Sequence, residues 1–302
     1  MSNSPSNWPQ FSDLLPSGQS SGQYSRRFKR GGLPSKKPMG LMGANLLAVA
    51  IALSSVAEPA KADLQAPETA PGALTQLLSD IDAAANSRDI DRVMEFVSDD
   101  FVHSDGLTAD TLEDSTQAFW DRFDALNYST EIIGWESDGD DWTVQTLTTV
   151  IGLDVIGNRS GRLEATVESR QQFEDGVLVE QTILSEESQI TLGDNSPIVD
   201  VNLAEQVGVG ESFSFDAIVL EPLGNRILLG TAFDEPVDVD GYLNPAVITL
   251  DLLSAGGLFK VGVAPAEVGD RWISAVVVRD DGITALTRRL QVVPPGEVSN
   301  TP

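Results

Sequence analysis

The chain of 302 residues contains no cysteine. Disulfide bonds, thiol nucleophiles, and zinc or iron–sulfur sites held by cysteine are therefore excluded. The chain has only one histidine, His103, so metal sites built from pairs of histidines are excluded as well. A single imidazole remains as a group that can exchange a proton near neutral pH. Nothing in the sequence calls for a cofactor, and we expect none.

Basic residues are scarce after residue 62. Residues 63–302 carry 12 Lys/Arg against 44 Asp/Glu, and Lys260 is their only lysine. A surface this acidic repels phosphate backbones, so nucleic acid is excluded as a partner. Basic peptides, cations and neutral ligands remain open. The acidity serves solubility in general or tolerance of a saline medium, and the sequence does not distinguish the two.

Residues 1–62 differ from the rest, with seven Lys/Arg against two Asp/Glu. A basic stretch rich in Ser, Pro and Gly precedes an uncharged apolar run over residues 39–57 and the tripeptide Ala60-Lys61-Ala62. This order indicates a signal peptide with a long, disordered basic region, cleaved after Ala62. We therefore expect export to the periplasm, the cell exterior or a photosynthetic lumen, with membrane contact only during export. The alternative is an uncleaved anchor over residues 39–57, because that run approaches the ~20 residues that span a bilayer.

Apolar residues at helical spacing predict three helices after a Pro-containing linker over residues 63–71. We expect Asp89 to cap the second helix, and Asp110 with Glu113 to form a capping box at the third. The predicted helices run over Ala73–Asn86, Ile90–Val97 and Thr111–Leu126.

From Tyr128 onward the apolar period changes to two. The segments are separated by Asp-Gly or Gly-Asn turns, which are typical of antiparallel hairpins. The predicted strands are Tyr128–Glu136, Trp142–Val155, Arg162–Phe173 and Val177–Ile190. Three helices packed on one face of a curved antiparallel sheet give an α+β domain over residues 72–193.

Two stretches in this region, DIDRVMEFVSDDFVHSDG (89–106) and ATVESRQQFEDGVLVEQTILSEES (165–188), carry a resemblance. With the order of the elements, they resemble the nuclear transport factor 2-like superfamily, which includes the SnoaL-like polyketide cyclases and ketosteroid isomerases. The resemblance implies a cone-shaped domain that encloses an apolar pocket. Some members catalyse isomerisation, cyclisation or dehydration there, and others only bind or assemble. The Asp base and the Tyr and Asp donors of the isomerases have no residue-by-residue match here.

Residues 200–293 show short segments of period two with a turn about every ten residues. This pattern predicts an all-β sandwich and resembles bacterial immunoglobulin-like modules. We expect Trp272 in its core, an independently folding unit on each side of residues 193–200, and a disordered tail over residues 294–302. The predicted strands are 212–221, 225–233, 246–253, 258–263, 271–278 and 283–292.

His103 and Asp105 are the candidate catalytic residues. They lie two positions apart before the third helix, so in an extended segment both side chains point to one face. If they form an acid–base pair, the carboxylate should raise the pKa of His103 above its usual ~6.5. The alternative is a hydrogen-bonded histidine at the edge of the pocket, followed by an ordinary turn at Gly106.

Five further residues are candidates for the pocket wall. Four are aromatic, and these either line the pocket or fill the core. Arg170 is costly inside the pocket unless Glu168 or Glu180 pairs with it; otherwise it lies on the surface. The five candidates are Phe119, Trp120, Tyr128, Trp135 and Arg170.

The sequence therefore favours an exported, non-catalytic protein with a pocket for a small apolar ligand and a β-domain that docks onto an envelope protein. A homodimer through the sheet of the first domain is a further option. The alternative is an enzyme that acts on a small hydrophobic substrate by proton transfer through His103 and Asp105. A purely structural role in an envelope complex is the third reading.

Overall fold

A computed structural model describes residues 64–156, 159–222, 224, 226–243, 248–253 and 256–298. The predicted signal peptide, with Ala60, Ala62 and the apolar run 39–57, lies outside these residues, as does the end of the predicted tail. Export therefore stays a prediction. Within the described part of the chain, no helix is long and apolar enough to cross a membrane.

The three predicted helices are present, with shifted ends. They are α1 (Gly72–Ser87), α2 (Ile90–Met94) and α3 (Ala109–Trp120), preceded by a short 3-10 turn, η2 (Pro67–Thr69). Asp89 caps α2 by accepting a 3.1 Å hydrogen bond from the Arg92 N–H, as predicted. The capping box of α3 is formed by Thr108 and Thr111, so the prediction of Asp110 and Glu113 is wrong.

The third helix ends six residues earlier than predicted. Phe123 and Leu126 pack over Gly152 of the neighbouring strand, where an added Cβ would lie 2.9 and 3.2 Å from their side-chain atoms. Their apolar spacing therefore reflects packing onto a strand. Leu126 itself pairs with Gly152 in the sheet.

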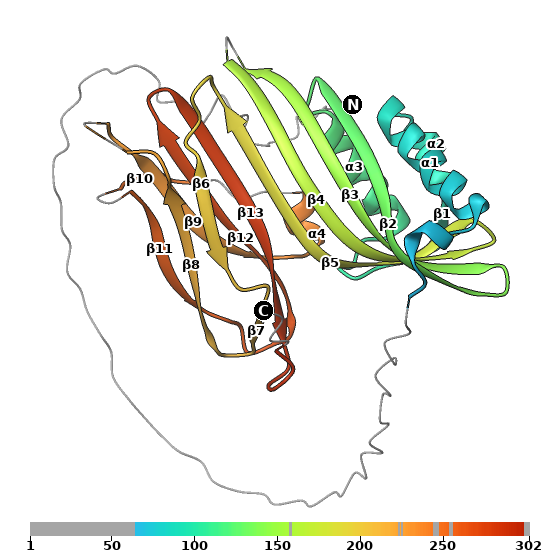
Figure 1. Cartoon of the computed structure of the whole chain (residues 1–302). Helices are drawn as coiled ribbons and strands as arrows, with labels where there is room; N and C mark the ends of the chain where they lie inside the picture. Colours follow the sequence, from blue (N-terminus) through green and yellow to red (C-terminus); the bar gives the residue numbers. More distant parts are fainter. Residues whose placement is uncertain are drawn as a thin grey trace, which may run out of the picture. The chain divides into compact units, whose positions relative to one another are not determined.

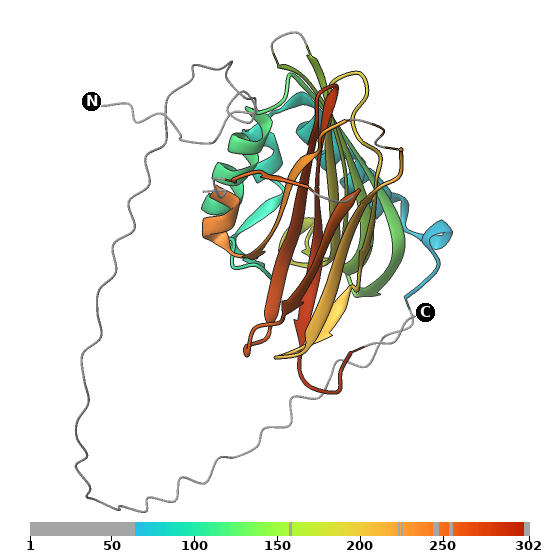
Figure 2. The ribbon, with the colours of Figure 1, turned by 90° about the vertical axis from the view of Figure 1, so that its left-hand side faces the viewer.

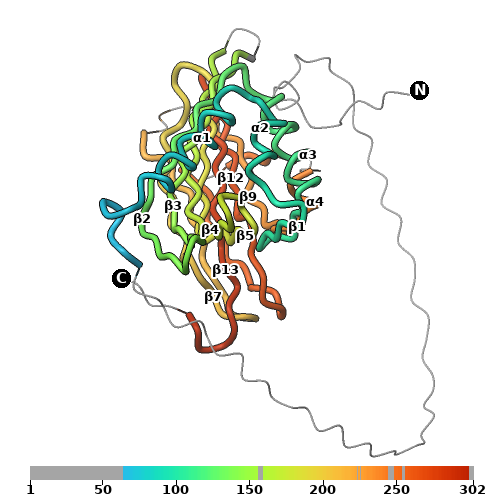
Figure 3. The backbone as a smooth tube through the Cα atoms, turned by 90° about the vertical axis from the view of Figure 1, so that its right-hand side faces the viewer, coloured from blue at the N-terminus to red at the C-terminus, as the bar shows by residue number. Residues whose placement is uncertain are grey.

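The structure is mostly β-sheet. The larger sheet has the order β10-β9-β12-β13-β5-β4-β3-β2, with β1 added beside β5 and β7 beside β13. Its first part is a curved antiparallel run of long strands with α1, α2 and α3 on one face (Figures 1 and 3). The long antiparallel strands are β2 (Ala125–Asp138), β3 (Asp141–Ile156), β4 (Arg159–Glu174) and β5 (Val177–Leu192). The shorter β1 (Val97–His103) pairs parallel with β5.

The sheet continues beyond residue 193 without a break in its hydrogen bonding. The continuing strands are β7 (Gln206–Gly208), β9 (Leu229–Pro236), β10 (Asp251–Leu252), β12 (Gly269–Arg279) and β13 (Gly282–Val293). A second sheet, β11-β8-β6, is formed by β6 (Val199–Leu203), β8 (Ser212–Val219) and β11 (Gly257–Val263). The described residues belong to one compact unit, and the boundary near residue 193 stays a prediction.

Strand β5 joins the two parts of the larger sheet. One of its edges pairs with β4 along the full length. The other edge is shared, because β1 pairs with it as far as Gln181 and β13 pairs with it from Glu187 to Leu192. Residues 182–186 lie between these two partners, and Ser104 and Gln291 bind the backbone there, at Ile183 and Leu184.

Two apolar cores flank the larger sheet. One lies between α1 and the curved strands and includes Leu74, Leu78, Val144 and Phe173. The other lies between β9, β12 and β13 and the second sheet. A short helix that the sequence did not predict, α4 (Val239–Leu243), follows β9 and contacts α3; Figure 2 shows it, in orange, beside α3.

Candidate functional site

A cavity of about 530 Å³ lies between the three N-terminal helices and the inner face of the curved strands. Its walls are mainly apolar, with Leu78, Val93, Leu112 and Ile183 among them. The C-terminal part of the chain contributes Gly241 and Tyr242 from α4 and Trp272 from β12. We call this cavity the pocket.

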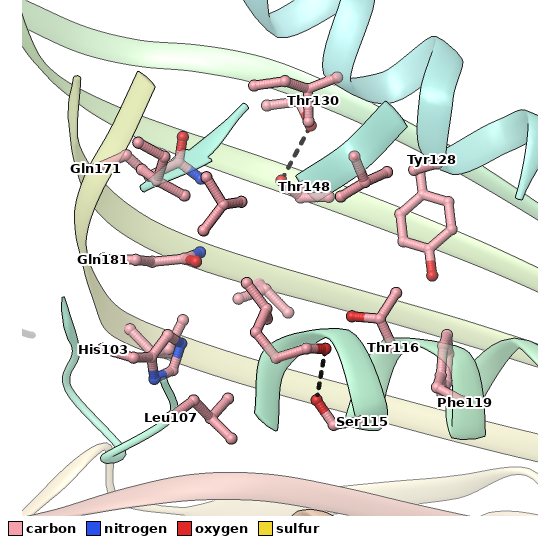
Figure 4. A pocket seen from close by; sticks show the side chains of 18 of the residues that line it. His103, Leu107, Ser115, Thr116, Phe119, Tyr128, Thr130, Thr148, Gln171 and Gln181 are labelled. Carbon is pink, nitrogen blue, oxygen red and sulfur yellow. Dashed lines mark hydrogen bonds between the residues drawn. The ribbon is translucent and has the colours of Figure 1, made fainter. Parts of the chain in front are cut away.

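Three of the five predicted wall residues line the pocket: Phe119, Trp120 and Tyr128. The Trp120 Nε1–H donates a 3.0 Å hydrogen bond to the Tyr128 hydroxyl. Burial raises the pKa of Tyr128 to about 12, so its hydroxyl stays protonated in the physiological range. Figure 4 shows Phe119 and Tyr128 at the opposite end of the pocket from His103.

The other two predicted wall residues are not among the residues that line the pocket. Trp135 packs in the core beneath α1 and donates from Nε1 to Thr69 Oγ1 at 3.1 Å. Arg170 follows Ser169 and precedes Gln171 on β4; because Gln171 lines the pocket, alternation turns Arg170 toward the opposite face. Among the described residues, no ion pair joins Arg170 to Glu168 or Glu180, and its Nε is buried without a partner.

His103, Gln181 and Gln171 form a polar side of the pocket (Figure 4). His103 is 7% exposed, and its Nδ1 accepts a 3.1 Å hydrogen bond from the Asp105 backbone N–H. Since Nδ1 accepts, the neutral ring carries its proton on Nε2. Gln171 and Gln181 each donate from Nε2 to Ser169 Oγ at 3.3 Å, and the Oε1 of Gln171 is buried without a partner.

Asp105 is close to His103 but binds another residue. The shortest His103 Nδ1 to Asp105 carboxylate distance is 3.8 Å. Both carboxylate oxygens accept hydrogen bonds from Arg289 of β13, from Nη1 at 3.0 Å and from Nη2 at 2.8 Å. The Tyr242 hydroxyl donates to Oδ2 at 2.7 Å, and the Ser104 hydroxyl donates to Oδ1 at 3.0 Å.

Arg289 is the buried centre of a larger cluster of charged and polar side chains. Its side chain is 1% exposed and also binds Glu186 at 2.9 Å and Asp270 at 2.8 Å. Trp272 donates from Nε1 to the same Glu186 oxygen at 2.9 Å, so it closes the pocket rather than filling the β-core as predicted. We call Arg289, Asp105, Glu186, Asp270 and Tyr242 the Arg289 cluster.

The pKa of His103 is lowered, which is the opposite of the rise expected if His103 and Asp105 formed an acid–base pair. Burial is the largest cause, because it disfavours the imidazolium, and the Arg289 charge adds to it; together they outweigh Asp105, which acts in the opposite direction. Burial also acts to raise the pKa of Asp105, but the hydrogen bonds and charge of Arg289 prevail and lower it. His103 is therefore neutral, and Asp105 is ionised.

The sequence did not indicate Arg289, Tyr242 or Glu186. Arg289 follows Arg288 in an otherwise uncharged strand, and alternation places neighbouring side chains on opposite faces. That signal indicates that one arginine points inward, but it does not identify the partner, which lies 184 residues away. Within the described residues, no group of three or more acidic or histidine side chains is arranged to hold a metal ion.

A family model described as "Domain of unknown function (DUF8623)" matches residues 194–293. This stretch contributes Tyr242, Trp272 and Arg289 to the site. A search of curated proteins finds no match to the chain.

Several solved structures are similar to parts of the chain. An LEH-like epoxide hydrolase of M. tuberculosis has 15% identity and a TM-score of 0.27 over 37% of this chain and 80% of that one. A hexachlorocyclohexane dehydrochlorinase (LinA) type 2 has 19% identity and a TM-score of 0.29 over 37% and 81%. Bd1075 of Bdellovibrio bacteriovorus has 11% identity and a TM-score of 0.28 over 36% and 38%. Similarities of this size do not carry an activity over to this chain.

Proposed function

We propose that the chain is a ligand-binding protein whose ligand is a small, mainly apolar molecule with one hydrogen-bonding oxygen. In this proposal the helices and the curved strands form a nuclear transport factor 2-like cone, and the C-terminal half is an immunoglobulin-like β-domain that completes the wall of the cone. The observation that carries the proposal is the pocket, whose walls are mainly apolar and which holds the polar side chains of His103, Gln171 and Gln181 together on one side. Further hydroxyl groups, those of Thr130, Thr148 and Tyr128 among them, lie elsewhere on its wall.

The size of the pocket supports this role. A volume of about 530 Å³ is in the range of sites that enclose small organic molecules. Burial of an apolar ligand against side chains such as Leu112 and Phe119 would supply most of the binding energy, because it removes apolar surface from water.

The polar side of the pocket supports an oxygen on the ligand. His103 offers an N–H donor from Nε2, and Gln171 has a buried acceptor, Oε1, with no partner among the described residues. An unpaired buried polar group costs free energy, so a ligand hydroxyl that pairs with it stabilises the complex. A hydroxyl can accept from one group and donate to the other.

The contacts of Asp105 favour binding over proton transfer. A general base must have a free lone pair directed at the substrate. Arg289, Tyr242 and Ser104 occupy both oxygens of Asp105, and the Nδ1 of His103 accepts a backbone N–H. In this arrangement His103 serves as a hydrogen-bond donor to the ligand.

We predict that 1-naphthol binds about fivefold more tightly than naphthalene, because only the naphthol forms a hydrogen bond with the polar side of the pocket. Quenching of tryptophan fluorescence reports the binding of both probes, since Trp120 lines the pocket. His103→Phe should remove most of the preference for naphthol while naphthalene still binds.

The matched variants for this experiment lie on α3. Thr116 lines the pocket and the next residue, Gln117, is exposed. Thr116→Phe fills the pocket and should weaken both probes at least tenfold, whereas Gln117→Phe should leave both affinities unchanged. Absence of binding by either probe, or equal effects of the two substitutions, would contradict the proposal.

A further inference from the structure

We infer that Arg289, a residue of the C-terminal half, is a positioning residue for the pocket: it binds the Asp105 carboxylate and so keeps His103 neutral, with its proton on Nε2. Arg289 would have this role in the ligand-free protein, so it can be tested independently of the proposed function.

The geometry links the two residues through Asp105. The guanidinium binds both oxygens of Asp105 in a bidentate pair, a geometry that fixes a carboxylate in orientation as well as position. Fixing the side chain of Asp105 also fixes its peptide unit, and the N–H of that unit donates to His103 Nδ1. Ser104, between them, binds the Gln181 carbonyl and the Ile183 N–H of β5, which holds the backbone in place.

The place of the Arg289 cluster in the fold explains why the C-terminal half can act on His103. The cluster lies beside residues 182–186, where the shared edge of β5 passes from β1 to β13. His103 is the last residue of β1, and Arg289 follows the last residue of β13 that pairs with β5. Strands β1 and β13 pair with successive parts of the same edge of β5, and they therefore bring His103 and Arg289 close to each other.

The charges around Arg289 explain how it would prevent proton uptake by His103. Asp105, Glu186 and Asp270 are three carboxylates around one guanidinium. Without the guanidinium, Asp105 would be a buried carboxylate 3.8 Å from His103 Nδ1 with only hydroxyl donors left, from Ser104 and Tyr242. An imidazolium would then be the nearest available cation, and proton uptake by His103 would become favourable.

The consequence for ligand choice rests on the proposed function. A neutral Nε2–H donor suits a hydroxyl or carbonyl oxygen, whereas an imidazolium in an apolar pocket would favour a carboxylate. Arg289 would therefore exclude carboxylate ligands from the pocket without lining the pocket itself.

The experiment uses the nitrogen and carbon NMR resonances of His103, which are unambiguous because the chain has one histidine. The full chain is purified without a histidine tag and titrated between pH 5 and 9. In the parent protein we expect a neutral ring with the proton on Nε2. In Arg289→Met we expect the titration midpoint to rise by about one pH unit or more, because an unshielded carboxylate now faces the ring. In Arg289→Met/Asp105→Asn the midpoint should return to the parent value.

Arg279→Met is the matched control. The Arg279 side chain is buried, like that of Arg289, and binds Asp281, Glu221 and the Asn195 carbonyl instead of the Arg289 cluster. Its loss should leave the His103 resonances unchanged. If Arg289→Met does not fold, Tyr242→Phe removes one donor from Asp105 and should give a smaller rise of the midpoint. An unchanged midpoint in a folded variant, or an equal shift in Arg279→Met, would overturn the inference.

Discussion

At the scale of single residues, His103 and Asp105 show that the spacing of two residues does not determine whether they interact as an acid–base pair, because a distant arginine can bind one of them. The spacing of the two residues is that of an acid–base pair, and both are buried. The pKa of each is nevertheless lowered. For His103 the main cause is burial, which disfavours the imidazolium, and the charge of Arg289 adds to it. For Asp105 the hydrogen bonds and charge of Arg289 outweigh the opposite effect of burial. His103 and Asp105 therefore do not form an imidazolium–carboxylate pair, although the two side chains lie close together.

This state of His103 predicts how stability depends on pH. The pKa of His103 is lower in the folded protein than in the unfolded chain, so the unfolded chain binds the proton first. Stability from this residue is therefore complete above the unfolded pKa of about 6.5 and is lost as the pH falls below it. We expect the free energy of unfolding to be lower at pH 5 than at pH 8, and part of this loss to come from His103.

Urea unfolding at the two pH values checks this prediction, with His103→Gln as the comparison. The variant lacks the titrating ring and should lose correspondingly less stability over this interval. The contribution of Asp105 does not interfere, because a carboxylate with a lowered pKa loses its stabilising charge only below about pH 4. Equal losses in the parent protein and the variant would contradict the prediction.

At this scale, sequence reasoning places residues better than it assigns their states. His103, Phe119 and Trp120 line the pocket because their position before and along α3 is a local property of the chain, and Tyr128 joins them from β2. The protonation state of His103 depends on burial and on the charges of Asp105 and Arg289, and only the tertiary structure buries the ring and brings Arg289 near. Trp135 and Arg170 were assigned to the pocket on side-chain type alone, which does not indicate the face of a strand on which they lie.

At the scale of elements, turns were the reliable signal. The Asp-Gly turns that end β2 and β4 were predicted, and Asp175 and Gly176 both have positive φ, at 50° and 81°. The weak signals were short elements. Strands β6 and β7 and helix α4 have only three to five residues each, too few for a period to appear. The end of α3 was misplaced because helical spacing and packing onto Gly152 require the same apolar residues.

Gly193 connects β5 to the rest of the chain and allows an element-scale prediction. Its φ is +98°, and an added Cβ would lie 2.8 Å from the Asp281 carbonyl oxygen in the turn between β12 and β13. Gly139, in the turn between β2 and β3, has a φ of +67° and nothing within 4 Å of such a Cβ. Gly139→Ala should therefore cost about 1 kcal/mol of stability from backbone strain alone.

Gly193→Ala should cost about 1–3 kcal/mol more, because the new methyl group meets backbone that cannot move aside. Thermal unfolding of the two variants and the parent measures the difference. Similar melting temperatures for both variants would show that the turn between β12 and β13 yields easily, contrary to this expectation.

At the scale of the whole molecule, the continuous sheet bears on the expectation of two independently folding units. Composition and pattern change near residue 193, and the family match begins at residue 194. Hydrogen bonding does not change there, because β13 pairs with Glu187–Leu192 of β5. A change in the spacing of apolar residues indicates that the kind of packing changes at that point of the chain. It does not indicate where a cooperatively folding unit ends.

We predict that residues 64–193 expressed alone unfold with little cooperativity, whereas residues 64–298 unfold in one sharp transition. The shorter chain would leave part of the β5 edge unpaired and would bury Asp105 without Arg289, which leaves an uncompensated charge. Circular dichroism during heating distinguishes the two behaviours. A sharp transition of residues 64–193 would instead support a self-sufficient first unit.

The shared edge of β5 also limits how this chain can recombine during evolution. A gene fusion that replaced everything after residue 193 would expose a row of unpaired backbone groups on β5, an edge open to pairing with other chains and hence to aggregation. The same fusion would remove Tyr242, Trp272 and Arg289 from the pocket. The two halves are therefore expected to be inherited together, and substitutions in β13 should be compensated by changes around Asp105 rather than within the C-terminal half alone.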